Sequence, residues 1–247
     1  MKDLHCHLPF GISDGPPEIS ESLEMLRIAA DNGVSYINAV AHYAPDSRSP
    51  VEHAVDSLRE AAARYNITLH AGFEYTFMDL LESQEPFLTI GDSSSSILVD
   101  FNTDTIPSFA PMRFYEIMSK GTRIILVHPE ILFTRHAIPM LTRLADMRVA
   151  FMLNAASFLP EALPPVRNMA HRLLRSGIAK LVASDAHAAA GPRRYVLQEA
   201  RKAVSIQYGE ENARILFEVN PDRVLQNLSP YDLNLPEEPF WKRWFSC

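Results

Sequence analysis

Short runs of hydrophobic residues alternate along the chain with longer segments in which hydrophobic and polar positions recur at helical spacing. The short runs are rich in β-branched and aromatic residues, which is typical of buried strands. Such an alternation predicts βα units around a parallel sheet. The predicted strands cover seven segments, residues 2–5, 36–40, 67–73, 97–101, 123–127, 149–153 and 180–183.

The amphipathic segments carry ordinary signals for the start and the end of helices. Several begin with proline in the first turn, and Gly33, Gly121 and Gly177 follow the ends of three of them. The serine run at 93–96 lies between a short helix and a strand, so we expect a solvated turn there. The predicted helices cover residues 17–32, 50–65, 111–120, 135–147, 165–176, 192–208 and 210–219.

Composition narrows the class of protein. The 247 residues are 47% hydrophobic and 21% charged, which is ordinary for a water-soluble globular protein, and α/β barrels often have this length. The net charge of −7 offers no basic surface to nucleic acid. No hydrophobic run approaches the roughly 18 residues of a membrane span, and polar residues begin at Asp3, where an export signal would be hydrophobic. We therefore expect a cytoplasmic protein that neither binds nucleic acid nor inserts into a membrane.

The last part of the chain differs from the rest, because it is rich in proline and ends in a group of aromatic residues. We expect a barrel domain over residues 1–225 and an extension over residues 226–247 that packs on the barrel exterior. An oligomer contact is the alternative for the aromatic group. Its members are Phe240, Trp241, Trp244 and Phe245.

Polar residues follow every predicted strand. In a parallel α/β barrel the carboxyl ends of the strands meet on one face, so these residues should be neighbours. A mixture of imidazole and carboxylate groups suits Mn, Fe or Zn. In chain order the residues are His5, His7, His42, Glu74, Asp100, His128, Asn154, Asp185 and His187.

The first pair has its own geometry. Residues two apart on a strand point the same way, so His5 and His7 can bind one ion while Cys6 faces away. This motif is weak evidence alone, but with the other strand ends it predicts a metal centre. Asp14 precedes a glycine and is read equally well as a turn residue or as a functional one.

Cysteine chemistry is not indicated. Cysteine phosphatases need arginine six positions after the nucleophile, but the position six after Cys6 holds Ile12. A phosphate-binding Gly-x-x-x-x-Gly-Lys-Ser/Thr loop is also missing, so a nucleotide hydrolase has no support.

Seven motifs, taken in order, are specific. They are His5-Cys6-His7, Asp14-Gly15, the segment 21–25, Ala41-His42-Tyr43, Gly72-Phe73-Glu74, Val127-His128-Pro129-Glu130 and Ala183-Ser184-Asp185-Ala186-His187. This set resembles the polymerase-and-histidinol-phosphatase (PHP) superfamily, and more narrowly the manganese-dependent bacterial protein-tyrosine phosphatases of capsule and exopolysaccharide synthesis. The resemblance extends over residues 1 to about 225 and implies a distorted (β/α)7 barrel of the TIM type with up to three metal ions.

The resemblance also implies which residues hold the ions. Mn²⁺ is the expected metal, with Fe or Zn as the alternatives. One ion would bind His5, His7, Glu74 and Asp185, a second Glu74, Asp100 and His128, and a third Asp14, His42 and His187.

Two departures from the family pattern bear on the site. Asp100 stands where the family usually has glutamate, so its carboxylate is one methylene shorter. Ile131 follows His-Pro-Glu where the family often has arginine, so another residue must bind phosphate. The candidates for that role are Arg135, Arg193 and Arg194.

These features predict a phosphomonoesterase that acts on protein phosphotyrosine, with the tail of a bacterial tyrosine kinase of capsule or exopolysaccharide synthesis as the substrate. Metal ions supply the charge and the activated water, so no covalent intermediate is required. His42 or His187 is the candidate proton donor to the leaving group. Tyr43, Tyr75 or Phe133, if exposed, would stack on the phenyl ring.

Three other functions remain open from the sequence. A small-molecule PHP phosphatase, such as one for histidinol phosphate, would share the metals but cleave an alkyl ester. A metal nuclease of the TatD type also opens with His-x-His-Leu, although the negative charge disfavours DNA. A non-catalytic regulator would use the barrel to bind a kinase tail without metal.

Overall fold

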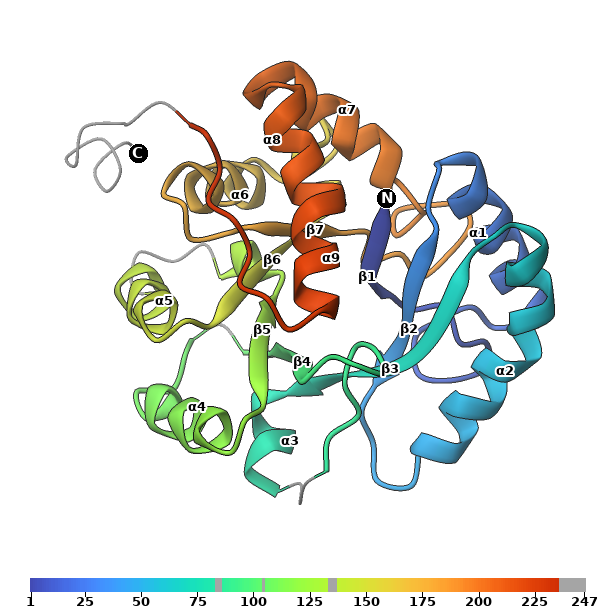
Figure 1. The fold of residues 1–247 in the computed structure, drawn as a ribbon, viewed down its shortest axis with the longest axis horizontal. Coiled ribbons are helices and arrows are strands. Elements are labelled where there is room, and N and C mark those ends of the chain that lie inside the picture. Colours follow the sequence, from blue (N-terminus) through green and yellow to red (C-terminus); the bar gives the residue numbers. More distant parts are fainter. Residues whose placement is uncertain (83–85, 104, 133–136, 236–247) are drawn as a thin grey trace.

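The computed structural model describes residues 1–82, 86–103, 105–132 and 137–235. In these residues strands and helices alternate as predicted, and seven strands form one sheet in sequence order with each neighbouring pair parallel (Figure 1). The strands are β1 (Lys2–Cys6), β2 (Tyr36–His42), β3 (Thr68–Thr76), β4 (Ser96–Asp100), β5 (Arg123–Val127), β6 (Ala150–Asn154) and β7 (Leu181–Ala183).

The sheet curls into a nearly closed barrel, because the segment after β7 returns to β1. The backbone N–H of Asp185 donates to the carbonyl of His5 at 2.9 Å, and that of His7 donates to the carbonyl of Ala186 at 2.9 Å. An isolated bridge pairs Cys6 with Ala186. The expected distorted (β/α)7 barrel is therefore confirmed.

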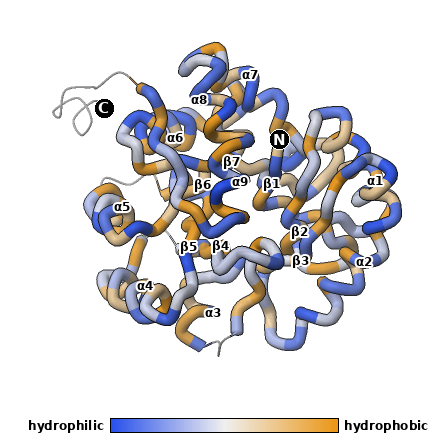
Figure 2. Tube along the Cα trace, viewed as in Figure 1, coloured by the Kyte–Doolittle hydropathy of each residue, from blue (hydrophilic) through white to orange (hydrophobic). Residues whose placement is uncertain are grey.

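Helices surround the barrel and carry both hydrophobic and hydrophilic residues (Figure 2), as expected for helices that bury one face against a sheet. No helix in the described part of the chain is both long and apolar enough to cross a bilayer. They are α1 (Ile19–Asp31), α2 (Arg48–Arg64), α3 (Phe77–Glu82), α4 (Ala110–Ser119), α5 (Ala137–Asp146), α6 (Pro164–Arg175), α7 (Leu197–Tyr208), α8 (Glu210–Arg214) and α9 (Asn220–Leu225), with short 3₁₀ turns η1 (Pro129–Ile131) and η2 (Ala155–Phe158) and a π-helical segment η3 (Ile215–Val219).

Two helix boundaries differ from the prediction by more than two residues. The helix expected from residue 192 begins at Leu197, because the preceding loop folds back on itself and the N–H of His187 donates to the carbonyl of Arg193 at 2.9 Å. The helix expected to end at residue 219 continues through η3 into α9. The segment after β7 is therefore a loop over the barrel mouth.

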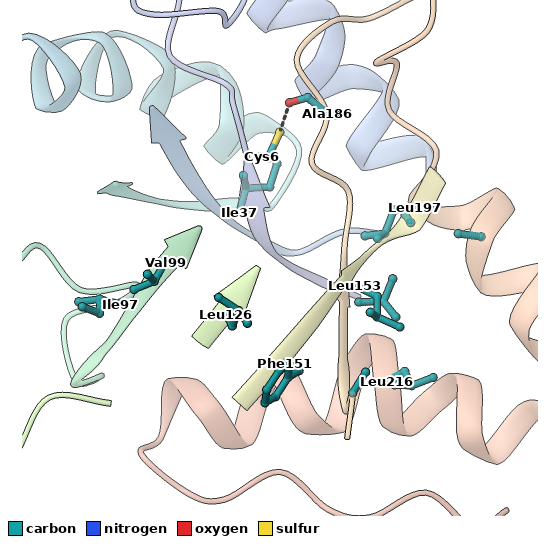
Figure 3. Close-up of a cluster of buried hydrophobic side chains, with 14 of the residues drawn as sticks. Cys6, Ile37, Ile97, Val99, Leu126, Phe151, Leu153, Ala186, Leu197 and Leu216 are labelled. Atoms are coloured by element: carbon teal, nitrogen blue, oxygen red, sulfur yellow. Dashed lines mark hydrogen bonds between the residues drawn. The ribbon is translucent and has the colours of Figure 1, made fainter. Parts of the chain in front are cut away.

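Hydrophobic residues form two layers on either side of the strands. Leu4 belongs to an inner cluster with Val40, whereas Cys6 belongs to the outer cluster between strands and helices (Figure 3). Residues two apart on a regular strand would share a face, and a bulge in β1 between Asp3 and Cys6 breaks that alternation. Cys6 faces away from the histidines on either side of it, as expected.

Helix α9 covers the amino-terminal end of the barrel. Its Val224 packs into the inner cluster, and the side chain of Asn220 donates to the carbonyl of Lys180 at 2.8 Å, at the start of β7. The serine run beneath it is only in part the solvated turn that the sequence predicts, since Ser93 is exposed in a turn. Ser94 and Ser96 are buried, because the turn lies against α9 and Ser96 already begins β4. Because α9 closes this end of the barrel, we expect a functional site at the opposite end, where the carboxyl ends of the strands lie.

The start of the predicted extension lies against the barrel. The backbone N–H of Tyr231 donates to the side chain of Asn220 at 2.7 Å, and that of Asn234 donates to the side chain of Asn212 at 2.8 Å. Residues 236–247, with the four aromatic residues of the tail, lie outside the described residues. The role expected for those aromatic residues therefore stays a prediction.

Candidate metal centre

The carboxyl ends of the strands bring the predicted ligands together. Each group below offers one ligand atom per residue, and within a group these atoms lie within 4.8 Å of one another. The groups are His7, Asp14, His42 and His187; His5, Glu74 and His128; and His5, His7 and Asp185. Neighbouring groups share residues, so the cluster is continuous.

Glu74, near the end of β3, lies at the centre of this cluster and is buried. Its Oε2 atom is 3.1 Å from Nε2 of His5 and 3.0 Å from Nε2 of His7, and its Oε1 atom is 2.8 Å from Nε2 of His128. Burial raises the pKa of this carboxyl, but the imidazoles of His5 and His128 outweigh burial and hold the pKa well below its usual range. Glu74 is therefore an ionised carboxylate able to bridge two ions.

Asp14, between β1 and α1, lies among three histidines. Its carboxylate oxygens are 3.5 Å from Nδ1 of His7, 3.4 Å from Nε2 of His42 and 3.3 Å from Nε2 of His187. Its interactions with His7 and Arg193 lower the pKa of Asp14 far below its usual range despite partial burial. The geometry favours the functional interpretation of Asp14 over that of a plain turn residue.

Gly15 explains how the loop reaches this position. A Cβ atom on this residue would lie 2.8 Å from the carbonyl oxygen of Pro9 and 3.2 Å from that of His7. Only glycine allows two backbone segments to approach so closely. The Asp-Gly pair therefore holds Asp14 over the first strand.

The second ligand set implied by the resemblance is assembled only in part. Asp100, at the end of β4, is buried, and its Oδ1 atom lies 3.7 Å from Nδ1 of His128. The group formed around Glu74 and His128 takes His5 as its third member rather than Asp100. The side chain of Asp100 is one methylene shorter than the glutamate that the resemblance leads one to expect at this position.

Two observations show that the residues fit a cation. The Nδ1 atoms of His7 and His128 are buried and have no hydrogen-bond partner among the described residues, since the nearby carboxylate oxygens of Asp14 and Asp100 are 3.5 and 3.7 Å away. Such buried atoms are costly unless something else satisfies them. Burial disfavours the charged imidazole, yet interaction with Asp14 and Glu74 raises the pKa of His7 to about 9, and interaction with Glu74 raises that of His128 to about 10. The carboxylates thus attract positive charge to the centre. Imidazole and carboxylate ligands of this kind suit Mn, Fe or Zn.

Two of the candidate ligands have strained backbones. His128 has φ 34° and Asp185 has φ 50°, both in the left-handed region that residues with a Cβ atom seldom adopt. Such strain is typical of functional sites, where the surrounding structure enforces a particular direction for a side chain. His128 directly follows β5, and Asp185 lies two residues after the end of β7.

Two positioning residues were not assigned a role from the sequence. Glu130, in the His-Pro-Glu motif, is fully buried, and its Oε1 atom accepts hydrogen bonds from the backbone of Asn154 and the hydroxyl of Ser157, both at 2.7 Å. The side chain of Asn154 in turn donates to Oδ2 of Asp185 at 2.6 Å. Asp3 accepts from the backbone N–H of Ser184 at 3.0 Å. Asp3 lies within β1 and Glu130 lies within η1, so the pattern of residues at strand ends, which located the candidate ligands, does not locate these two residues.

The three candidate arginines have different positions. Arg193 donates to Asp14 at 2.6 Å and contacts Nε2 of His187, so it borders the centre. Arg194 makes a bidentate pair with Glu199 at 2.6 and 2.8 Å. Arg135 lies outside the described residues. Arg193 is therefore the described arginine best placed for phosphate.

The expected aromatic platform is partly wrong. Tyr75 is only 2% exposed, and its hydroxyl accepts a hydrogen bond from the N–H of Leu88, so it belongs to the core. Tyr43 is half-buried and makes an edge contact with Phe73. Phe133 lies outside the described residues. Tyr43 directly follows the candidate ligand His42 and keeps some exposure, so it is the remaining described candidate for stacking on the phenyl ring.

Ser13 stands in a Gly-x-Ser-x-Gly sequence, the spacing of a serine-hydrolase nucleophile. In that motif the serine follows its strand directly and bonds to a histidine base. Ser13 lies well beyond the end of β1 at Cys6, and its hydroxyl donates to Asp14 at 3.3 Å. The geometry does not support a serine nucleophile.

A parallel barrel with imidazoles and carboxylates gathered at its strand ends is the architecture of a metal-dependent barrel protein. Within that class, the chain belongs to the CpsB/CapC family of capsular polysaccharide synthesis, whose family model matches residues 1–226. The resemblance drawn from the motifs is thereby confirmed.

Similar proteins extend the comparison. The tyrosine-protein phosphatase YwqE of Bacillus subtilis (strain 168) is 27% identical over 253 residues, which cover 98% of each chain. The tyrosine-protein phosphatase CpsB of Streptococcus pneumoniae is 25% identical over 92% of this chain and 99% of its own. A crystal structure from work on YwqE and CpsB as "unique metal-dependent tyrosine phosphatases" matches 97% of this chain and 100% of its own at 25% identity, with a TM-score of 0.82.

Proposed function

We propose that this protein is a metal-dependent protein-tyrosine phosphatase that acts in capsule or exopolysaccharide synthesis. The observation that carries the proposal is the continuous cluster of imidazoles around the carboxylate of Glu74, in a chain whose similar proteins are named tyrosine-protein phosphatases. We further propose Mn²⁺ as the metal, and a phosphorylated tail of a tyrosine kinase in the cytoplasm as the substrate.

The three groups of ligands described above would hold up to three ions. When bound, divalent ions neutralise the oxygens of a phosphomonoester and lower the pKa of a water molecule to about 7. The chain itself fixes the ligands, because Asn154 holds Asp185, Glu130 holds Asn154, and Asp3 holds the loop that carries His187. Such supports keep ligands in the orientation that a metal needs.

Arg193 is the proposed phosphate-binding residue. Its side chain is 49% exposed and already binds a carboxylate, that of Asp14, at the edge of the centre. A guanidinium can also donate two parallel hydrogen bonds to the oxygens of a phosphate. It would therefore orient the phosphoryl group and stabilise its charge.

His42 is the proposed proton donor to the leaving group when its imidazole is not engaged by a metal ion. Its side chain is 39% exposed, whereas that of His187 is 3% exposed and lies against Arg193. The more exposed imidazole can reach a leaving oxygen that points toward solvent. A tyrosine phenolate has an ordinary pKa of about 10, so it needs less assistance than an alkoxide.

Phosphate release tests this proposal. Chelator-stripped protein, alone or refilled with Mn²⁺, Zn²⁺ or Fe²⁺, is incubated with a phosphotyrosine peptide and, separately, with histidinol phosphate. His128→Ala is the inactivating variant, and His53→Ala, on the exposed face of α2, is its matched control. We expect metal-restored release from the peptide, unchanged in the control and lost in His128→Ala.

Other outcomes would replace the proposal with one of the alternatives. Release from histidinol phosphate but not from the peptide would make the protein a small-molecule phosphatase on the same barrel. Cleavage of DNA would favour the metal nuclease. Binding of a kinase tail by metal-free protein, with no hydrolysis of any ester, would favour the non-catalytic regulator.

A further inference from the structure

A hollow with a volume of about 330 Å³ lies beside the metal centre, between η1, η2, the start of α6 and the loop after β7. This volume is at the lower end of the range for small-ligand pockets, and it is large enough for one bulky side chain. The wall is mainly apolar. Its apolar members include Ile131, Ala156, Leu159, Leu163, Val166 and Pro192.

The hollow and the metal centre share a wall. Asn154 lines the hollow, and its side chain donates to Oδ2 of Asp185 at 2.6 Å. The loop that supplies Pro192 to the hollow continues directly into Arg193, which borders the centre. A peptide whose phosphotyrosine reaches the centre can therefore place a neighbouring side chain in the hollow.

The charges at the rim disfavour an acidic occupant. The charged residues among the described lining are Glu161 and Arg194. Arg194 is already bonded through both terminal nitrogens to Glu199, and that pairing, with Glu161 nearby, raises its pKa. These two acids offset the charge of Arg194, so the described lining offers no unpaired cation to a carboxylate, and an apolar group is the suitable occupant.

Ile131 makes this wall more apolar. It is 46% exposed in η1, one turn after His128, at the position where the resemblance leads one to expect an arginine. An exposed isoleucine offers apolar surface that a ligand can bury, but it offers no charge to an acidic ligand. Ile131 therefore favours an uncharged side chain at the mouth of the hollow.

We infer that this hollow is a specificity subsite that binds an apolar side chain near the phosphotyrosine of the peptide substrate. The inference rests on the proposed phosphatase function, and it assigns the substrate an apolar residue where an acidic one would be disfavoured. Burial of one leucine or phenylalanine side chain is expected to raise kcat/KM by roughly tenfold or more.

The test compares phosphotyrosine peptides that are identical except at single positions on either side of the phosphotyrosine, where leucine, phenylalanine, serine or aspartate is placed. kcat/KM is measured for each peptide and divided by the value for p-nitrophenyl phosphate with the same protein. Dissociation constants are also measured for matching peptides that carry a non-hydrolysable phosphonate. We expect one position at which leucine or phenylalanine is preferred over aspartate in both measurements.

Leu163→Asp is the decisive variant. Leu163 is 68% exposed and occupies the N-cap of α6, where aspartate is a favoured residue, so the variant should fold. Its charge stands at the wall of the hollow and should reduce the preference for the apolar peptide to roughly that for serine. Ile206→Asp, which changes an 88% exposed residue of α7, is the matched control and should keep the preference.

The outcomes separate this inference from the function on which it rests. Equal kcat/KM for all peptides, or a preference that survives in Leu163→Asp, would overturn the subsite while the phosphatase stands. Absence of hydrolysis of every aryl phosphate would overturn the proposed function. If the phosphonate peptides then still bind with the apolar preference, the hollow remains a peptide-binding subsite of a protein that is not a phosphatase.

Discussion

The hydroxyl of Tyr195 donates a 2.7 Å hydrogen bond to Oδ2 of Asp3, and the two residues are 192 positions apart in the chain. Both are almost completely buried. Asp3 precedes His5 on β1, and Tyr195 follows the loop that carries Asp185 and His187. This bond therefore ties together the two segments between which the barrel closes and on which four of the candidate ligands lie.

Tyr195→Phe removes this bond and leaves Oδ2 of Asp3 buried without it. We expect the free energy of unfolding to fall by about 1–3 kcal/mol, the usual cost of an unsatisfied buried polar group. We also expect weaker Mn²⁺ binding, because the two segments that carry ligands are no longer held in register. Denaturant unfolding and metal titration measure the two effects. Tyr65→Phe, on an exposed side chain, is the control, and identical values for both variants would contradict the prediction.

Metal binding should release protons. In the metal-free protein the pKa of His7 is about 9 and that of His128 about 10, so both imidazoles are protonated at neutral pH. A ligand must be neutral, so each ion that binds to them displaces protons. Affinity for Mn²⁺ should rise with pH up to these values and fall as the pH decreases. Calorimetry in buffers of different ionisation enthalpy measures the release, for which we expect about two protons; a heat that is independent of the buffer would contradict this.

Asp100 should control the occupancy of one ion. Asp100→Asn removes a carboxylate that lies 3.7 Å from His128, and we expect roughly tenfold weaker retention of that ion. Asp100→Glu adds the methylene that brings the carboxylate closer to His128 and should retain it at least as well as the natural residue. Metal content per chain after equilibrium dialysis distinguishes the three proteins. Equal metal content in all of them would show that Asp100 is not a ligand.

Arg193→Met should weaken the binding of phosphate esters. It removes the guanidinium that borders the centre, and we expect KM for a phosphotyrosine peptide to rise by about tenfold, the effect of losing a charge-assisted hydrogen bond. Arg194→Met changes a side chain that is paired with Glu199 and should have a much smaller effect. Steady-state kinetics of the two variants compare them directly, and a larger effect of Arg194→Met would reverse the assignment.

The fold could be predicted to a large extent, because each strand is a short hydrophobic run with a polar residue at its end. The strand predicted at 123–127 agrees with β5 at both ends. The loop before α7 could not be predicted, since its backbone bonds join His187 to Arg193 and nothing in local spacing reveals them. The burial of Ser94 depends on α9, a helix more than a hundred positions later.

The same contrast holds for the site. Candidate ligands could be predicted because parallel strands carry their ends to one face, and that rule needs only the order of the chain. Asp3 and Glu130 could not, because each acts through a partner distant in sequence, Tyr195 and Asn154. The value of such residues appears only when the barrel has brought those partners together.

The placement of α9 at the amino-terminal end of the barrel has a consequence for biosynthesis. The inner cluster contains Leu4 and Val40, which emerge from the ribosome early, and Val224, which emerges near the end. Val224 is synthesised after all seven strands, so the nascent chain exposes apolar residues of the inner cluster until α9 has been made. Premature termination before residue 220 would leave that surface uncovered. Truncated chains of this kind should be targets of chaperones and proteases, even though they contain all the candidate metal ligands.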